Sequence, residues 1–64
     1  MRIDKAKLEI EMARACMNAV DLSEAANMPR TTVNNVVAGR EARPATIGKI
    51  AKALGIDVMD IIEQ

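Results

Sequence analysis

The chain has 64 residues and no formal net charge, because nine basic residues balance nine acidic ones. Half of the residues are hydrophobic and none is aromatic, so a core must be built from aliphatic side chains and methionine. These values predict a single domain near the lower size limit for folding on one core. No apolar stretch approaches the ~20 residues of a membrane span, and no signal peptide is visible at Met1.

The residue types present argue against an enzyme or a metalloprotein. The chain lacks histidine, which excludes a Ser-His-Asp triad and a Cys/His zinc site. It also lacks a glycine-rich phosphate loop and paired acidic residues, so we expect no catalytic group, cofactor, metal or small-molecule ligand. The single cysteine, Cys16, cannot form an internal disulfide, and we expect a small packed hydrophobe in a reducing cytoplasm.

Capping residues mark the start of two helices. Asp4 is a good N-cap for a helix that runs to about Met17. Asn18 is a second N-cap, and Asp21 stands where a capping box has its partner residue. The second helix is therefore predicted over about residues 19–26.

Turn residues define the next helix. Asn27 occupies a turn, because asparagine is the non-glycine residue that best tolerates the left-handed conformation. Pro29 suits the first turn of the following helix, where a missing N–H costs nothing, and Gly39 ends that helix. Residues 40–43, REAR, then form a loop that leads to Pro44.

Pro44 opens a helix with an amphipathic pattern. Its apolar residues recur at the spacing i, i+3, i+4 and i+7, and they are Ile47, Ile50, Ala51 and Leu54. Gly55 closes this helix, and Asp57 caps a last short helix over about residues 58–62. The chain is therefore predicted to be all-α, with five short helices and short connections.

The helix that precedes Gly39 is polar on one side only, and this is the most informative feature of the chain. At about 100° per residue its valines gather on one side. The opposite side carries no carboxylate and consists of Arg30, Thr31, Asn34 and Asn35. Such groups pair with base edges in a DNA major groove, Asn with adenine and Arg with guanine. The pattern predicts a DNA-binding helix-turn-helix over about residues 19–38.

The charges are unevenly distributed along the chain. Residues 30–52 contain five basic residues and one acidic residue, Glu41. A local cationic surface is what phosphate contact requires, whatever the total charge. The alternative is a solvated helical surface on which charges scatter without function.

The ordered set of these features resembles the lambda repressor/Cro-like (XRE family) helix-turn-helix domains. The resemblance extends over residues 8–62, and its matching positions are Leu22-Ser23, Asn27-Met28, Thr32-Val33, Gly39, Pro44, KIAKALGID from Lys49 to Asp57, and Val58 to Ile62. It implies that residues 1–64 form a compact five-helix domain that binds double-stranded DNA. It further implies a transcriptional regulator, for which we expect repression rather than activation.

The resemblance also implies roles for individual residues. The base-reading positions of the family fall on Arg30, Thr31, Thr32, Asn34 and Asn35. Positions that contact the DNA backbone fall on Asn18, Arg40 and Arg43. The Ser or Thr that usually caps the reading helix is replaced by Pro29, so that side-chain cap is absent here.

Two questions of association stay open. The predicted N-terminal helix has a second apolar stripe around Ile3 and Ile10, which is either exposed or a protein–protein contact. A protein-interaction module without its own DNA specificity is the alternative to DNA binding. Relatives pair on half-sites ~34 Å apart, so we expect a monomer or weak homodimer that pairs on a palindromic operator through the region after Gly55.

Overall fold

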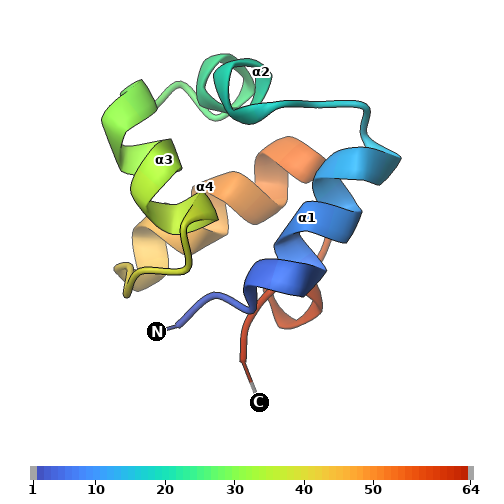
Figure 1. The fold of residues 1–64 in the computed structure, drawn as a ribbon, viewed down its shortest axis with the longest axis vertical. Coiled ribbons are helices and arrows are strands. Elements are labelled where there is room, and N and C mark those ends of the chain that lie inside the picture. The colour runs from blue at the N-terminus through green and yellow to red at the C-terminus, as the bar shows by residue number, and fades with distance from the viewer. Residues whose placement is uncertain (1, 64) are drawn as a thin grey trace.

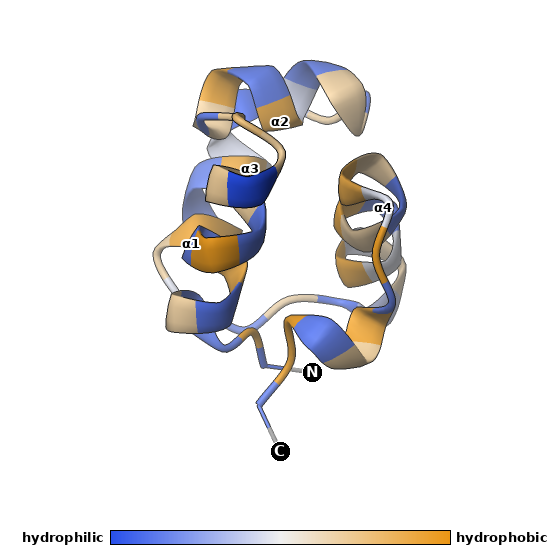
Figure 2. Cartoon of the chain, turned by 90° about the vertical axis from the view of Figure 1, so that its right-hand side faces the viewer, coloured by the Kyte–Doolittle hydropathy of each residue, from blue (hydrophilic) through white to orange (hydrophobic). Residues whose placement is uncertain are grey.

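Four α-helices and one short 3-10 helix make up the computed structural model, which describes residues 2–63. They are α1 (Lys5–Arg14), α2 (Ala19–Ala25), α3 (Arg30–Val37), α4 (Pro44–Leu54) and η1 (Val58–Asp60). Helices α1 and α3 lie on one side of the domain and α4 on the other, behind them in Figure 1 and to their right in Figure 2, and α2 closes one end. The all-α prediction is confirmed.

The predicted fifth helix is wrong in kind, because η1 is a 3-10 turn of three residues. Asp57 and Asp60 form a capping box at its N-terminal end: the carboxylate of Asp57 accepts from the N–H of Met59, and that of Asp60 accepts from the N–H of Asp57. The chain then leaves helical geometry at Ile61 and runs on to Ile62, which pairs with Ile3 in an antiparallel bridge. Pairing with the N-terminal segment therefore replaces a further helical turn.

The predicted N-terminal capping residues are confirmed for α1 and α2. The carboxylate of Asp4 accepts from the N–H of Lys7 at 3.1 Å. Asn18 and Asp21 form a reciprocal capping box with distances of 2.8 and 3.1 Å. At α3, Pro29 lies one residue before the helix rather than in its first turn, and no side chain caps that helix.

All four α-helices end in a Schellman turn with one left-handed residue, which follows the C-cap in α1, α2 and α3 and is the C-cap itself in α4. These left-handed residues are Cys16, Asn27, Gly39 and Gly55, with φ values of 56°, 54°, 87° and 70°. At the end of α1, the N–H of Met17 donates to the carbonyl of Met12 and that of Cys16 donates to Ala13. Such bonds satisfy carbonyl groups that a helix end leaves unpaired.

Two expectations about the end of α1 are wrong. The helix stops at Arg14 instead of continuing to about Met17, because the chain turns at Cys16. Cys16 is exposed rather than packed, since the turn directs the neighbouring Met17 against the core instead. A left-handed conformation at a cysteine costs about 1–2 kcal/mol, which packing of the adjacent chain must offset.

The core is aliphatic and lies among all four helices and the two chain ends. Its fully buried large residues are Ile3, Leu8, Leu22, Val33, Ile47, Ile50 and Ile61. The expectation that Ile3 belongs to an exposed stripe is wrong, because Ile3 is 1% exposed and precedes α1 in an extended segment. Ile10 is 53% exposed and remains on the surface.

Candidate nucleic-acid interface

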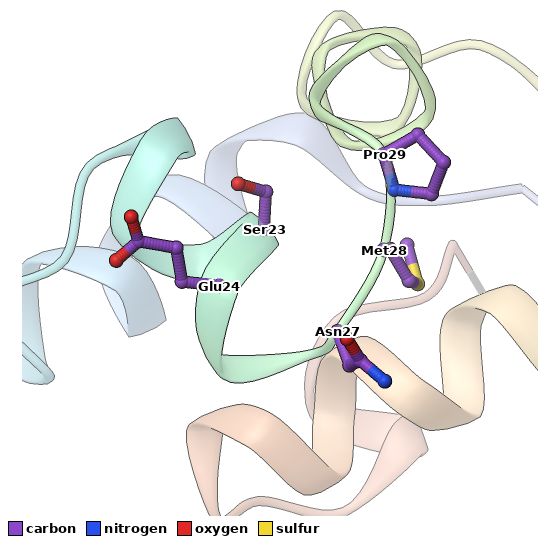
Figure 3. Close-up of a pocket in the computed structure, with 5 residues that line it drawn as sticks. All are labelled: Ser23, Glu24, Asn27, Met28 and Pro29. Carbon is purple, nitrogen blue, oxygen red and sulfur yellow. The ribbon is translucent and has the colours of Figure 1, made fainter.

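The α2–α3 unit has the geometry of a helix-turn-helix. After α2 the chain reverses at Asn27, where the N–H of Met28 donates to the carbonyl of Ser23 at 2.9 Å. Pro29 is extended and redirects the chain into α3. Figure 3 shows these residues around a shallow hollow between the end of α2 and the start of α3. Ser23 is buried, and its hydroxyl donates to the carbonyl of Val20.

Helix α3 has one buried side and one exposed side, as the helical wheel predicts. Val33 and Val36 are buried in the core, and Val37 packs partly against it. The exposed side carries Arg30, Thr31, Asn34 and Asn35. Within residues 2–63 their side chains make no hydrogen bond or ion pair, so their donors and acceptors are free to meet a ligand.

Thr32 is less exposed than the other four proposed base-reading residues. It is half-buried at the edge of α3 and lines a hollow of about 320 Å³ between α3, the loop and the start of α4. Asn35, Arg43 and Thr46 line the same hollow. The tertiary structure therefore brings two predicted base-reading residues, Thr32 and Asn35, and one predicted backbone-contacting residue, Arg43, to the same hollow.

Thr46 is a candidate that the sequence interpretation did not identify. It lies in the first turn of α4, where the N-cap Arg43 provides no side-chain hydrogen bond and Pro44 has no N–H. Backbone N–H groups in the first turn of a helix favour anions, and Thr46 lies in this turn and lines the hollow. The available sequence signal was a threonine in the first turn of a helix without a capping side chain.

At the start of α2, half of the side-chain amide of Asn18 is already used in a hydrogen bond. Its side-chain oxygen accepts from Asp21, so the amide NH₂ is the part that can donate to another molecule. The carboxylate of Asp21 lies at the same helix end and opposes the approach of an anion. Asn18 is therefore a weaker candidate for a phosphate contact than the arginines after α3.

The basic residues near α3 are not neutralised by neighbours. Arg30, Arg40 and Arg43 are exposed, and in the part of the chain that the structure describes the one ion pair joins Arg14 to Glu11 at 3.8 Å. The proposed reading side therefore has guanidinium groups at its beginning and beyond its end. This arrangement suits a polyanion whose charges flank a groove.

These features define a class of protein, a small all-helical domain with a helix-turn-helix and an exposed, unpaired polar side on its second helix. The Cro/C1-type HTH DNA-binding domain family matches residues 7–64, and the chain belongs to this family. The resemblance to lambda repressor/Cro-like domains is thereby confirmed. No curated protein and no solved structure matches the chain.

Among the residues that the structure describes, no helix has the length and apolar character to cross a membrane. In the same residues, no group of three or more Cys, Asp or Glu side chains is placed to hold a metal ion.

Proposed function

We propose that residues 1–64 form one DNA-binding domain that reads a specific duplex sequence by inserting α3 into the major groove. The observation that carries this proposal is the exposed side of α3, whose amide, hydroxyl and guanidinium groups are unpaired and lack a carboxylate. Membership of the Cro/C1-type family supports duplex DNA as the ligand. The regulatory outcome is repression, because a bound domain blocks access to its site without any further partner.

The proposed base contacts follow from side-chain chemistry. Arg30 donates two hydrogen bonds to guanine, and Asn34 and Asn35 each pair with an adenine edge. Thr31 contacts a base edge or a thymine methyl group, while the half-buried Thr32 lies at the rim of the contact. A good bidentate contact contributes about 1–3 kcal/mol of discrimination between bases.

The proposed backbone contacts hold α3 in register. Arg40 and Arg43 bind phosphates beside the C-terminal end of α3, and Asn18 donates from its amide group near the start of α2. Thr46 joins this set through its hydroxyl group. These contacts raise affinity for every sequence equally, because phosphates carry no base identity.

Two copies are proposed to pair on a palindromic operator, with the monomer or a weak dimer present in solution. The surface after Gly55 suits this contact because Met59 is 55% exposed there. Pairing on DNA adds a second reading helix about one helical turn away, ~34 Å, and so doubles the sequence that is read. Ile10 on α1 is the other exposed large apolar residue of the part that the structure describes, and it suits contacts other than this pairing.

Selection of bound sequences from a random duplex pool, followed by titration of variants, tests this proposal. We expect a palindromic consensus, and we expect Arg30→Ala and Asn34→Ala to weaken binding to it by about 5- to 150-fold. On random duplex, Asn34→Ala should lower the affinity several-fold less than Arg30→Ala does. The reason is that the charge of Arg30 also attracts phosphate. Arg43→Ala should instead weaken binding to both duplexes and lower the salt dependence by about one unit.

The outcomes separate the proposal from its rival. An unchanged ratio of consensus to random affinity in Arg30→Ala would show that α3 does not read the sequence as placed here. Absence of binding to any duplex at low salt would favour a protein-interaction module. A consensus without two-fold symmetry would contradict the paired arrangement alone.

A further inference from the structure

The N-terminal segment, residues 2–4, is held between two distant parts of the chain. Arg2 forms an antiparallel bridge with Glu41 in the loop after α3, and Ile3 forms one with Ile62. The carbonyl of Arg2 accepts from the N–H of Glu63 at 2.9 Å, and the N–H of Asp4 donates to Ile61 at 2.8 Å. Figure 1 shows this end of the chain below the C-terminal end of α3. The segment is therefore an ordered part of the fold.

Backbone pairing determines where the side chain of Arg2 lies. Successive side chains of an extended segment point to opposite faces, and Ile3 points into the core with 1% exposure. Arg2 therefore points outward, on the side that it shares with Glu41 across the bridge. Its side chain is exposed and forms no ion pair within residues 2–63.

Lys5 reaches the same region from the first turn of α1. A Cβ atom on Gly39 would lie 3.7 Å from the Cβ of Lys5 and 3.9 Å from its Cδ. The aliphatic stem of Lys5 thus crosses the turn that ends α3, while the residue as a whole stays exposed. The stem of Lys5 therefore lies against the turn from which the loop that begins with Arg40 continues.

We propose that Arg2 and Lys5 contact the DNA backbone beside the C-terminal end of α3. Together with Arg40 they form an N-terminal cationic rim, which extends the contacts assigned to the loop. The proposal rests on the proposed function, since it requires α3 in the major groove. Phosphates line both edges of a groove about 12 Å wide, so cations next to the end of an inserted helix lie close to them.

The ordered backbone makes these two cations effective. Arg2 and Lys5 are fixed at their Cα atoms by bridges and by packing, so binding orders their side chains but not the chain that carries them. Backbone ordering costs about 1–2 kcal/mol per residue, and this cost is met during folding rather than during binding. A charge count along residues 30–52 could not include them, because they come from the other end of the chain.

The competing explanation for the position of Lys5 is that it stabilises α3 and does not contact DNA. Helix α3 has no basic residue in its last turn, and the stem of Lys5 lies against Gly39 at its C-terminal end, so the positive charge of Lys5 would complement the negative end of the helix dipole. In that case the loss of Lys5 would lower thermal stability and leave the salt dependence of DNA binding unchanged. The two explanations therefore differ in a measurable way.

The test measures the affinity of Arg2→Gln, Lys5→Gln and the double variant for consensus and random duplex over a range of salt concentrations. We expect the slope of log affinity against log salt to fall by about 0.9 for each lost phosphate contact. Affinity should fall equally for both duplexes. Lys52→Gln is the matched control: Lys52 was counted among the basic residues of 30–52, but it lies in the last turn of α4, at the opposite end of that helix from the loop at residues 40–43, and no phosphate contact is proposed for it. The slope of this variant should equal that of the wild-type protein.

Each result has a distinct meaning. A double variant that melts like the wild type and keeps its slope would overturn the N-terminal rim. A lowered melting temperature with an unchanged slope would do the same and assign Lys5 to α3. If Arg43→Ala lowers the slope while the double variant does not, the proposed function stands without the rim. If the wild-type protein binds no duplex, both proposals fail.

Discussion

At the scale of single residues, Cys16 is the position where conformation and residue type disagree most. Its φ of 56° lies in the left-handed region, and its side chain is exposed. Asn27 has nearly the same φ, but asparagine adopts it more readily. The turn at Cys16 persists because it ends α1 and sets Met17 against the core.

Cys16→Gly is expected to stabilise the domain by about 0.5–1 kcal/mol. Glycine removes a left-handed cost of about 1–2 kcal/mol, and the greater freedom of the unfolded chain returns part of that gain. Urea denaturation under reducing conditions measures the change. Cys16→Ala is the control, because it removes the thiol and keeps the conformational cost. Equal stability of the two variants would contradict the strain at Cys16.

At the scale of elements, the four α-helices depend on packing more than on their own propensities. Helix α3 has eight residues, includes three valines and lacks a capping side chain. Isolated helices shorter than about 12–15 residues are marginal in water. The burial of Val33 and Val36 therefore keeps the proposed reading side ordered before any ligand binds.

Gly48→Ala in α4 is expected to stabilise the domain by about 0.5–1 kcal/mol, because glycine is unfavourable inside a helix. No heavy atom lies within 4 Å of the Cβ that alanine would add, so no clash opposes the gain. The same substitution at Gly55, where φ is 70°, should destabilise by about 1 kcal/mol. Thermal melting of both variants checks the pair. A loss of stability in Gly48→Ala would disprove the open space at that site.

At the scale of the whole molecule, the extended segment before α1 joins parts of the chain that are far apart in sequence. Ile3 fills the core between the chain ends, and its neighbours pair with residues 41 and 61–63. A domain of this size has little stability to spare. The bridge of Arg2 to Glu41 thus links the N-terminal segment to the loop that contains Arg40 and Arg43.

Ile3→Ala should destabilise the domain by about 2–5 kcal/mol, the usual cost of removing a fully buried isoleucine side chain. Ile10→Ala removes the same atoms from a side chain that is 53% exposed and should change stability by about 0.5 kcal/mol or less. Circular dichroism melting curves of both variants provide the comparison. Similar melting temperatures for the two would mean that Ile3 is not part of the core in solution.

Local chemistry determined much of what could be predicted here. The capping residues Asp4 and Asn18 and the turn residues Asn27, Gly39 and Gly55 all act on backbone groups within a few positions. The division of α3 into apolar and polar sides likewise follows from the helical period. The starts of α1 and α2 and the exposed face of α3 were therefore accessible from the sequence alone.

Tertiary structure decided the features that depend on distant residues. The bridges of Arg2 to Glu41 and of Ile3 to Ile62 bury one isoleucine, shorten the last helix and bring two cations beside α3. The hollow that contains Thr46 also needs α3, the loop and α4 to meet. No periodic pattern marks such contacts, because pairing between positions tens of residues apart depends on how the whole chain closes around its core.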